Sequence, residues 1–110
     1  MDKIKNILIC GATGFIGRNL LDHYSKKDCY NIRATHFKRP ALTKQYPNAE
    51  WVNVDLKNPS DLKWCLKDID IVLQFAATTS GSKDITTKPY IHVTDNAVMN
   101  SLILRECYEQ

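Results

Sequence analysis

The hydrophobic positions of this chain fall into short apolar runs that alternate with segments of helical periodicity. Residues 3–10 form an apolar, β-branched run, which predicts a buried strand. Apolar residues then recur three and four positions apart across 15–28, which predicts a helix. Three further runs predict strands at 30–37, 51–56 and 69–77. The last of these is nearly continuous in apolar residues, which is typical of a strand buried on both sides in a parallel sheet.

The segment 58–69 carries the signature of a helix start. Asn58 is expected to be the N-cap, Pro59 the first helical residue, and Asp61 an acid in the first turn. The buried face of this helix is predicted to comprise Leu62, Cys65, Leu66 and Ile69.

The remaining segments are two polar connections and a final helix. Residues 38–50 contain Pro40 and Pro47, which predicts a loop or a short broken helix. A polar loop is expected over 78–89, and a long helix over 90–110. Alternation of this kind predicts an α/β fold, a Rossmann-like doubly wound parallel sheet of about four strands with helices on both faces.

The chain shows no internal repeat or linker, so residues 1–110 are expected to form one domain. A helix after the fourth strand should return to a fifth, and no residues remain for it. We therefore expect the front part of a longer protein, truncated before the fifth strand, whose substrate-binding and catalytic portion lies elsewhere. The alternative is that the last helix caps an unusually small sheet. An unpaired sheet edge would favour association, such as a homodimer.

Composition narrows the class of protein. With 44% hydrophobic and 25% charged residues, the chain is typical of a soluble globular domain. A net charge of +3 without any basic run argues against a nucleic-acid partner. No apolar stretch is long enough for a membrane span or a signal peptide, so a cytoplasmic location is expected.

The four cysteines show no spacing typical of a metal site, so no metal is expected. We expect all four to be reduced thiols packed as small hydrophobic residues, as in a reducing cytosol. They are Cys10, Cys29, Cys65 and Cys107.

Three of the chain's four glycines, Gly11, Gly14 and Gly17, stand at a spacing of three between the first strand and the first helix. Gly11 would let the chain turn sharply off the strand, and Gly17 would let the helix pack closely. Gly14 lacks a Cβ, so a pyrophosphate could approach the backbone there. Unpaired amides and the helix dipole make such a corner an anion site. The alternative is a glycine-rich turn without a ligand. A P-loop is excluded, because no Gly-Lys-Ser/Thr follows.

Two stretches resemble the extended branch of the short-chain dehydrogenase/reductase superfamily, the NAD(P)-dependent epimerase/dehydratase group. "ILICGATGFIGRNLL" is similar to that family's opening strand, glycine turn and helix. "VDLKNPSDLKWCLKDIDIVLQFAA" is similar to its usual run of Asp-Leu, helix, apolar strand and Ala-Ala. The resemblance spans essentially all 110 residues and implies the fold more specifically than it implies the reaction.

The resemblance implies roles for individual residues. The three glycines would shape the pyrophosphate site, with backbone contacts from Thr13, Phe15 and Ile16. Asp55 and Leu56 would meet the adenine, the acid accepting a hydrogen bond from its exocyclic amine. The alternative for Asp55 is an acid that only shapes the loop before the helix.

Small residues at the end of the fourth strand, Ala76 and Ala77, would leave room for the ribose and nicotinamide, or would simply pack tightly. Thr78 would begin a loop facing the cofactor or substrate. Gln74 stands where relatives often carry histidine, and it receives no role.

The final helix departs further from the family pattern. Asn96 matches a family asparagine, which could be functional or could cap or face solvent. Asn100 replaces a threonine, and Met99 and Leu102 replace a glycine and an asparagine, which leaves the subgroup open.

The second strand indicates which nicotinamide cofactor the chain would take. NAD is usually held by an acid at the end of this strand. The stretch "NIRATHFKRP" contains no acid, whereas Lys38 and Arg39 could neutralise a 2′-phosphate, with Arg18 nearby. These residues favour NADP over NAD. The alternative is an ordinary Lys-Arg pair in a surface loop.

No catalytic residue is assigned. The family's chemistry resembles hydride transfer beside a Tyr-x-x-x-Lys pair. None of the five tyrosines has a lysine four positions on. The function implied is the NAD(P)-binding front of an epimerase, dehydratase or reductase, inactive alone, with a nucleotide sugar as the substrate class. The alternatives are a non-catalytic dinucleotide-binding module, serving as a sensor or scaffold, and an inactive truncated product.

Overall fold

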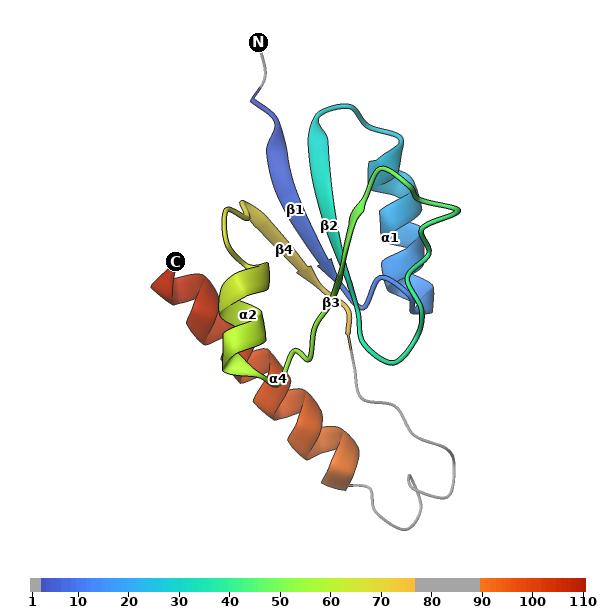
Figure 1. Ribbon diagram of the computed structural model, residues 1–110. Helices are drawn as coiled ribbons and strands as arrows, with labels where there is room; N and C mark the ends of the chain where they lie inside the picture. Colours follow the sequence, from blue (N-terminus) through green and yellow to red (C-terminus); the bar gives the residue numbers. More distant parts are fainter. Residues whose placement is uncertain (1–2, 77–89) are drawn as a thin grey trace.

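The structure, a computed structural model, describes residues 3–76 and 90–110 of the chain. As predicted from the sequence, four parallel strands form one sheet; their order in the structure is β3-β2-β1-β4. The elements in chain order are β1 (Lys5–Cys10), α1 (Phe15–Ser25), β2 (Tyr30–His36), β3 (Glu50–Asn53), α2 (Pro59–Cys65), β4 (Ile71–Gln74) and α4 (Tyr90–Glu109). Figure 1 shows this sheet with its helices.

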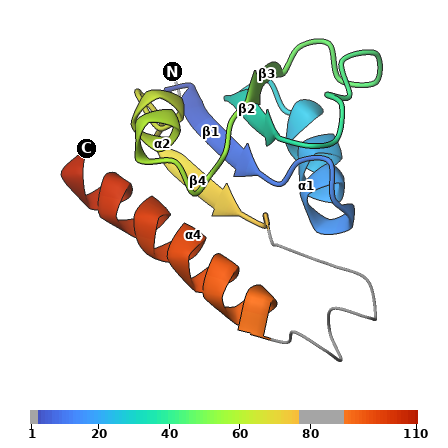
Figure 2. The same ribbon diagram turned by 60° about the horizontal axis from the view of Figure 1, so that its bottom comes forward.

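The helices lie on both faces of the sheet, as Figure 2 shows. There α1 covers one face, and α2 with α4 covers the other. The central strand β1 alternates between these two layers. Ile7 and Ile9 face the α1 side, whereas Leu8 and Cys10 face the side of α2 and α4. This alternation explains why the first apolar run is continuous, because a central parallel strand is buried on both faces.

Two hydrophobic clusters hold the layers together. The cluster on the α1 side comprises Ile7, Ile9, Ala12, Leu21, Ile32 and Ala34. The cluster beneath the other helices comprises Leu8, Cys10, Val52, Val54, Leu56, Leu62, Cys65, Leu66, Met99 and Ile103. Because α4 contributes two buried residues to the second cluster, it belongs to this core.

The start of α2 follows the sequence prediction. The side-chain oxygen of Asn58 accepts hydrogen bonds from the amides of Ser60 (2.9 Å) and Asp61 (3.2 Å), which satisfies two amides that the helix leaves unpaired. The helix ends at Cys65, earlier than its apolar periodicity predicts. Three residues later the backbone turns through a positive φ of 63° at Asp68.

Other element boundaries also differ from the sequence prediction by a few residues. The first helix ends at Ser25 rather than at 28, and β3 covers Glu50–Asn53 rather than 51–56. The segment 38–49 is a loop. Among the helices within the described ranges, none has the length and apolarity needed to cross a bilayer.

The expectation that the fourth strand is buried on both sides is wrong. In the described part of the chain β4 pairs only with β1, so it is the edge of the sheet. Ile71 is 38% exposed, and the rest of the strand is half-buried. The helix α1 packs on β1 and β2 and leaves this strand's outer side less covered.

The expectation that all four cysteines pack as hydrophobic residues is correct for two of them. Cys10 and Cys65 are buried, and burial raises the pKa of their thiols to about 12 and about 11. Cys29 and Cys107 are exposed, because one lies in the turn before β2 and the other on the outer part of α4. Within residues 3–76 and 90–110 no group of three or more His, Cys, Asp or Glu residues could hold a metal ion.

Candidate dinucleotide-binding site

The predicted site residues follow the carboxyl ends of the four strands. Gly11 follows β1, Lys38 follows β2, Asp55 follows β3 and Ala76 follows β4. Because all four strands are parallel, these residues lie along one edge of the sheet. That edge is where open α/β sheets bind their ligands.

The glycine turn begins at Gly11, which has a φ of +77°, a conformation that other residues rarely adopt. Its amide donates a hydrogen bond to the buried hydroxyl of Thr35 on β2 at 3.1 Å. A Cβ at this position would lie 2.6 Å from both the amide nitrogen and the Cα of Ala76. The turn is therefore fixed between β2 and the end of β4, and glycine is required here.

Gly17 is required for a different reason, because it packs against this turn. A Cβ at position 17 would overlap the carbonyl oxygen of Gly11 and would lie 3.1 Å from the Cα of Ala12. The predicted close approach of the helix is confirmed, and it is made against the turn that follows β1.

Among the residues that the structure describes, no contact requires glycine at position 14. Gly14 is the N-cap of α1 with extended dihedrals (φ −80°, ψ 174°), which any residue can adopt. A Cβ there would have one neighbour among the described atoms, the carbonyl oxygen of Gly11 at 3.5 Å. The space beside Gly14 is a surface pocket of about 330 Å³, lined by Thr13, Gly14, Phe15, Arg18 and Asn19. The missing side chain leaves this pocket open.

Backbone amides at this corner are available to a ligand. The amides of Thr13, Phe15 and Ile16 have no hydrogen-bond partner within the described ranges. The first turn of α1 also carries no acidic residue. Unpaired amides and the positive end of a helix dipole attract anions. This corner of the sheet edge can therefore hold a phosphate by main-chain groups alone.

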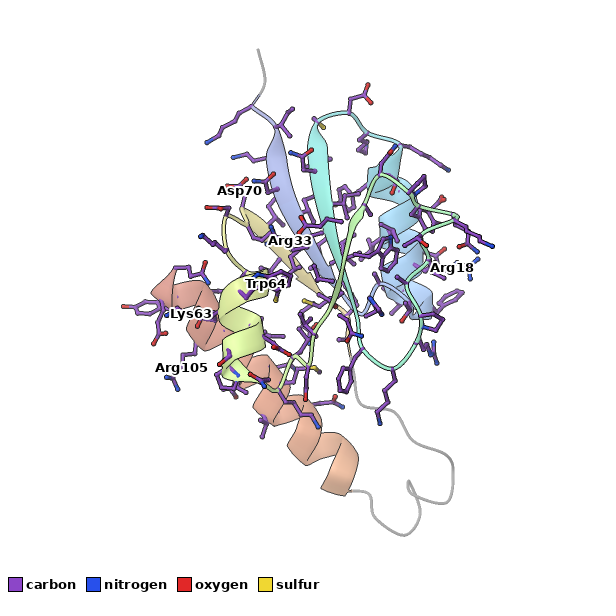
Figure 3. The ribbon with its side chains drawn as sticks, viewed as in Figure 1. Arg18, Arg33, Lys63, Trp64, Asp70 and Arg105 are labelled. Atoms are coloured by element: carbon purple, nitrogen blue, oxygen red, sulfur yellow. The ribbon has the colours of Figure 1, made fainter. Side chains whose placement is uncertain are left out.

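The basic residues after β2 reach toward the same corner. Arg39 Nη1 donates a hydrogen bond to the Thr13 carbonyl oxygen at 3.4 Å. The Arg39 carbonyl oxygen lies 2.9 Å from His36 Nδ1, which holds the loop against the end of β2. Lys38 is exposed beside Arg39. Arg18 projects from α1 on the side away from α2 and α4, as labelled in Figure 3.

Arg33, the first basic residue of this stretch, lies elsewhere. Its Nη1 donates hydrogen bonds to the carbonyl oxygens of Cys65 (2.7 Å) and Lys67 (2.9 Å), at the C-terminal end of α2. Its Nε lies 3.3 Å from Glu50 Oε2, an ion pair without aligned hydrogen-bond geometry. Figure 3 shows Arg33 between the sheet and α2. A cation at a helix C-terminus is stabilised by the helix dipole, so this arginine has a structural role.

Asp55 lies at the expected edge and also shapes its own loop. Its Oδ1 accepts a hydrogen bond from the Lys57 amide at 2.9 Å, and its amide donates to Asp61 Oδ2 at 2.9 Å. Leu56 is buried in the core beneath α2 and α4. The contacts of Asp55 agree with the loop-shaping alternative, and the adenine contact remains a prediction for both residues.

At the end of β4, the structure describes Ala76, and the predicted residues Ala77 and Thr78 lie outside the described residues. The sequence assigned no role to Gln74, yet its side chain binds both polar groups of the Ala76 backbone and also Asn100 on α4. The only signal in the sequence was that Gln74 and Asn100 both depart from the family pattern.

A larger pocket of about 460 Å³ lies at the opposite end of the sheet, between the C-terminal end of α1 and the loop before β3. It is crossed by a hydrogen bond from the Tyr46 hydroxyl to Asp22 Oδ1 at 3.2 Å. Lys26 pairs with the same carboxylate at 3.0 Å, and both contacts hold the pKa of Asp22 below its usual value. None of the predicted site residues lines this pocket.

A parallel sheet with a glycine turn between β1 and α1 defines a Rossmann-type domain. The family model of the NAD dependent epimerase/dehydratase family matches residues 7–110. The chain therefore belongs to that family.

Individual relatives are longer than this chain. It is 29% identical over 108 residues to an uncharacterized protein of Methanocaldococcus jannaschii, covering 86% of this chain and 33% of the relative. Pen from Bacillus thuringiensis has a similar structure, with a TM-score of 0.80 and 23% identity. The match covers 94% of this chain and 33% of the Pen chain. UDP-glucuronic acid 4-epimerase from Bacillus cereus, solved with UDP-glucuronic acid and NAD, has a TM-score of 0.72 and 26% identity. The match covers 93% of this chain and 36% of the epimerase chain. The chain thus spans about a third of each protein.

Proposed function

We propose that this chain binds a nicotinamide dinucleotide, with the pyrophosphate seated at the glycine turn. The observation that carries the proposal is the contrast between the three glycines. Gly11 and Gly17 are required by protein contacts, whereas the space beside Gly14 is open. The amides of Thr13, Phe15 and Ile16 around it are unpaired within the described ranges, so a bound phosphate would give them acceptors.

We propose further roles for the side chains around this corner. Asp55 and Leu56 would meet the adenine, and Ala76, with Ala77 and Thr78 after it, would border the ribose and nicotinamide. The Ala76 backbone lies against Gly11, which places this residue beside the glycine turn.

The cofactor we favour is NADP rather than NAD. Lys38 and Arg39 follow β2, where a 2′-phosphate would lie, and the stretch from Asn31 to Pro40 contains no acid to repel it. The hydrogen bond from Arg39 to Thr13 places its guanidinium group on the rim of the glycine turn. A guanidinium group can bind a phosphate with two hydrogen bonds.

For the whole protein we propose hydride transfer between the nicotinamide and a nucleotide sugar, as an epimerase, dehydratase or reductase. The similar structure from Bacillus cereus was solved with UDP-glucuronic acid and NAD, which supports this substrate class. We assign no catalytic residue to this chain and expect it to be inactive alone. A non-catalytic dinucleotide-binding module would share the same glycine turn, and so would an inactive truncated product.

The test is cofactor binding by titration calorimetry, with NADPH and NADH, to the parent chain and to Gly14→Val. The extended backbone of Gly14 accepts valine, so this variant should stay folded, with a loss of helix capping of about 1 kcal/mol. Its branched side chain would occupy the pocket and separate the amides from the phosphate, so binding should weaken about tenfold or more.

Urea unfolding of both proteins provides the control, because it shows whether a change in affinity comes from lost folding. A parent chain that binds neither nucleotide would contradict the proposal. So would a folded Gly14→Val variant with the parent's affinity.

A further inference from the structure

Gln74, the last residue of β4, makes three side-chain hydrogen bonds. Its Oε1 accepts from the Ala76 amide at 3.0 Å, and its Nε2 donates to the Ala76 carbonyl oxygen at 3.1 Å. The same Nε2 donates to Asn100 Oδ1 on α4 at 2.9 Å. One carboxamide therefore binds both polar groups of a single residue after the strand and links them to a helix 26 positions away in sequence.

The residue that Gln74 holds forms one wall of the glycine turn. The amide nitrogen and Cα of Ala76 lie against Gly11, so closely that a Cβ on that glycine would come within 2.6 Å of both. On the other side, the Thr35 hydroxyl accepts a hydrogen bond from the Gly11 amide. The turn is thus held from β2 by Thr35 and from β4 by Ala76.

We propose that Gln74 is a positioning residue for the cofactor site. It fixes the Ala76 backbone against Gly11 and thereby keeps the turn in the shape that presents its free amides, and Asn100 orients the Gln74 carboxamide. This inference rests on the function proposed above. In this role Gln74 acts without touching the cofactor, because both polar atoms of its side chain bind protein groups.

Glutamine suits this role because the contacts require an acceptor and a donor on one side chain. Glutamate would keep the acceptor for the Ala76 amide but would lose the donor to the Ala76 carbonyl. Leucine has a similar volume and would lose all three contacts. Asn100 needs only an acceptor toward Gln74, so aspartate can replace it and alanine cannot.

The experiment is a double-mutant cycle on cofactor affinity, with Gln74→Leu, Asn100→Ala and the double variant, titrated with NADPH and NADH by calorimetry. Losing hydrogen bonds of this kind should weaken binding about 3- to 10-fold in Gln74→Leu, and less in Asn100→Ala. Because Asn100 acts through Gln74, Asn100→Ala should have no effect in the Gln74→Leu background. Asn100→Asp should restore the parent's affinity. Arg105→Ala is the matched control on α4, since the ion pair that Arg105 makes among the described residues is with Glu109.

Amide hydrogen exchange gives a readout that does not depend on the cofactor. Exchange at Ala76 and Gly11 should accelerate in Gln74→Leu more than exchange in β1 does, whereas general destabilisation would accelerate both alike. If the parent chain binds the cofactor and Gln74→Leu binds it with the same affinity, the positioning role alone is overturned. The positioning role would also be overturned if the two substitutions had additive effects on cofactor affinity. The same holds if amide exchange accelerated equally at Ala76, Gly11 and β1. A parent chain without affinity would overturn the proposed function and this role together.

Discussion

Gly17 on α1 lies so close to the carbonyl group of Gly11 that a side chain at position 17 would overlap the Gly11 oxygen. This contact joins the first turn of the helix to the turn that follows β1. Gly14 lies between these two glycines in the sequence, yet within the described ranges a Cβ there would meet only the Gly11 carbonyl oxygen, at 3.5 Å. The three glycines of one motif therefore have different physical requirements, which substitution can separate.

The same substitution at two of these glycines should have unequal effects on stability. Gly17→Ser should lower the free energy of unfolding by about 2–3 kcal/mol, because the helix must move off the turn to make room. Gly14→Ser should change it by no more than about 0.5 kcal/mol, since the position is an N-cap with open space beside it. Urea unfolding followed by circular dichroism measures both. Equal losses of unfolding free energy at positions 14 and 17 would contradict the conclusion that only Gly17 is required by packing.

The basic pair after β2 should discriminate between the two nicotinamide cofactors. Lys38→Ala/Arg39→Ala should weaken NADPH binding about tenfold, because the 2′-phosphate loses its cationic partners, and should change NADH binding much less. Calorimetric titration with both nucleotides measures the difference. As a control, Lys26→Ala/Lys27→Ala removes the same charge from the far end of α1 and should leave the ratio of NADPH affinity to NADH affinity unchanged. An equal loss for both cofactors would argue against the NADP preference.

The N-cap of α2 should contribute measurably to stability. Asn58→Ala removes the acceptor for the amides of Ser60 and Asp61, which should lower the free energy of unfolding by about 1 kcal/mol. Asn58→Asp retains the acceptor and should preserve stability. Chemical denaturation of the three proteins tests this, and an alanine variant as stable as the parent would show that the cap contributes nothing.

The two buried thiols should make folding sensitive to alkaline pH. Burial raises the pKa of Cys10 to about 12 and that of Cys65 to about 11, from an ordinary value of 9.0. Above pH 9 the unfolded chain therefore loses protons that the folded chain keeps. The contribution of the two buried thiols to stability is complete below pH 9 and declines as the pH rises toward 11 and 12.

Urea unfolding between pH 8 and pH 10.5, a range set by these pKa values, measures this decline. Cys10→Ala/Cys65→Ala should show a shallower pH dependence than the parent. Cys29→Ala, which removes an exposed thiol, should match the parent's slope. Identical slopes in all three proteins would exclude the buried thiols as the cause.

The sequence predicted the order and type of the elements, because local patterns determine them. The apolar run of β1 and the cap at Asn58 depend on neighbouring residues, and both are confirmed. The predicted burial of β4 failed because exposure depends on which elements lie beside a strand. An apolar run alone cannot specify that β4 forms the edge in the described part of the chain.

The candidate site was predictable only where it depends on the backbone. The glycine spacing indicated the turn, and the structure shows that turn with open space beside Gly14. The contacts of Gln74 with Ala76 and Asn100 could not be predicted, because the helix is far away in sequence and has no motif that points to the strand end. The arginine at position 33 also looked similar to its basic neighbours, and only the packing of α2 separates it from them.

The unpaired amides at the glycine turn have a consequence for how relatives of this protein could diverge. Within residues 3–76 and 90–110 the amides of Phe15 and Ile16 have no hydrogen-bond partner, and the two residues are 85% and 55% exposed. Mutation can alter these two side chains without removing an amide. Substitution could therefore change the side chains around the glycine turn while the backbone keeps the amides that we propose bind phosphate.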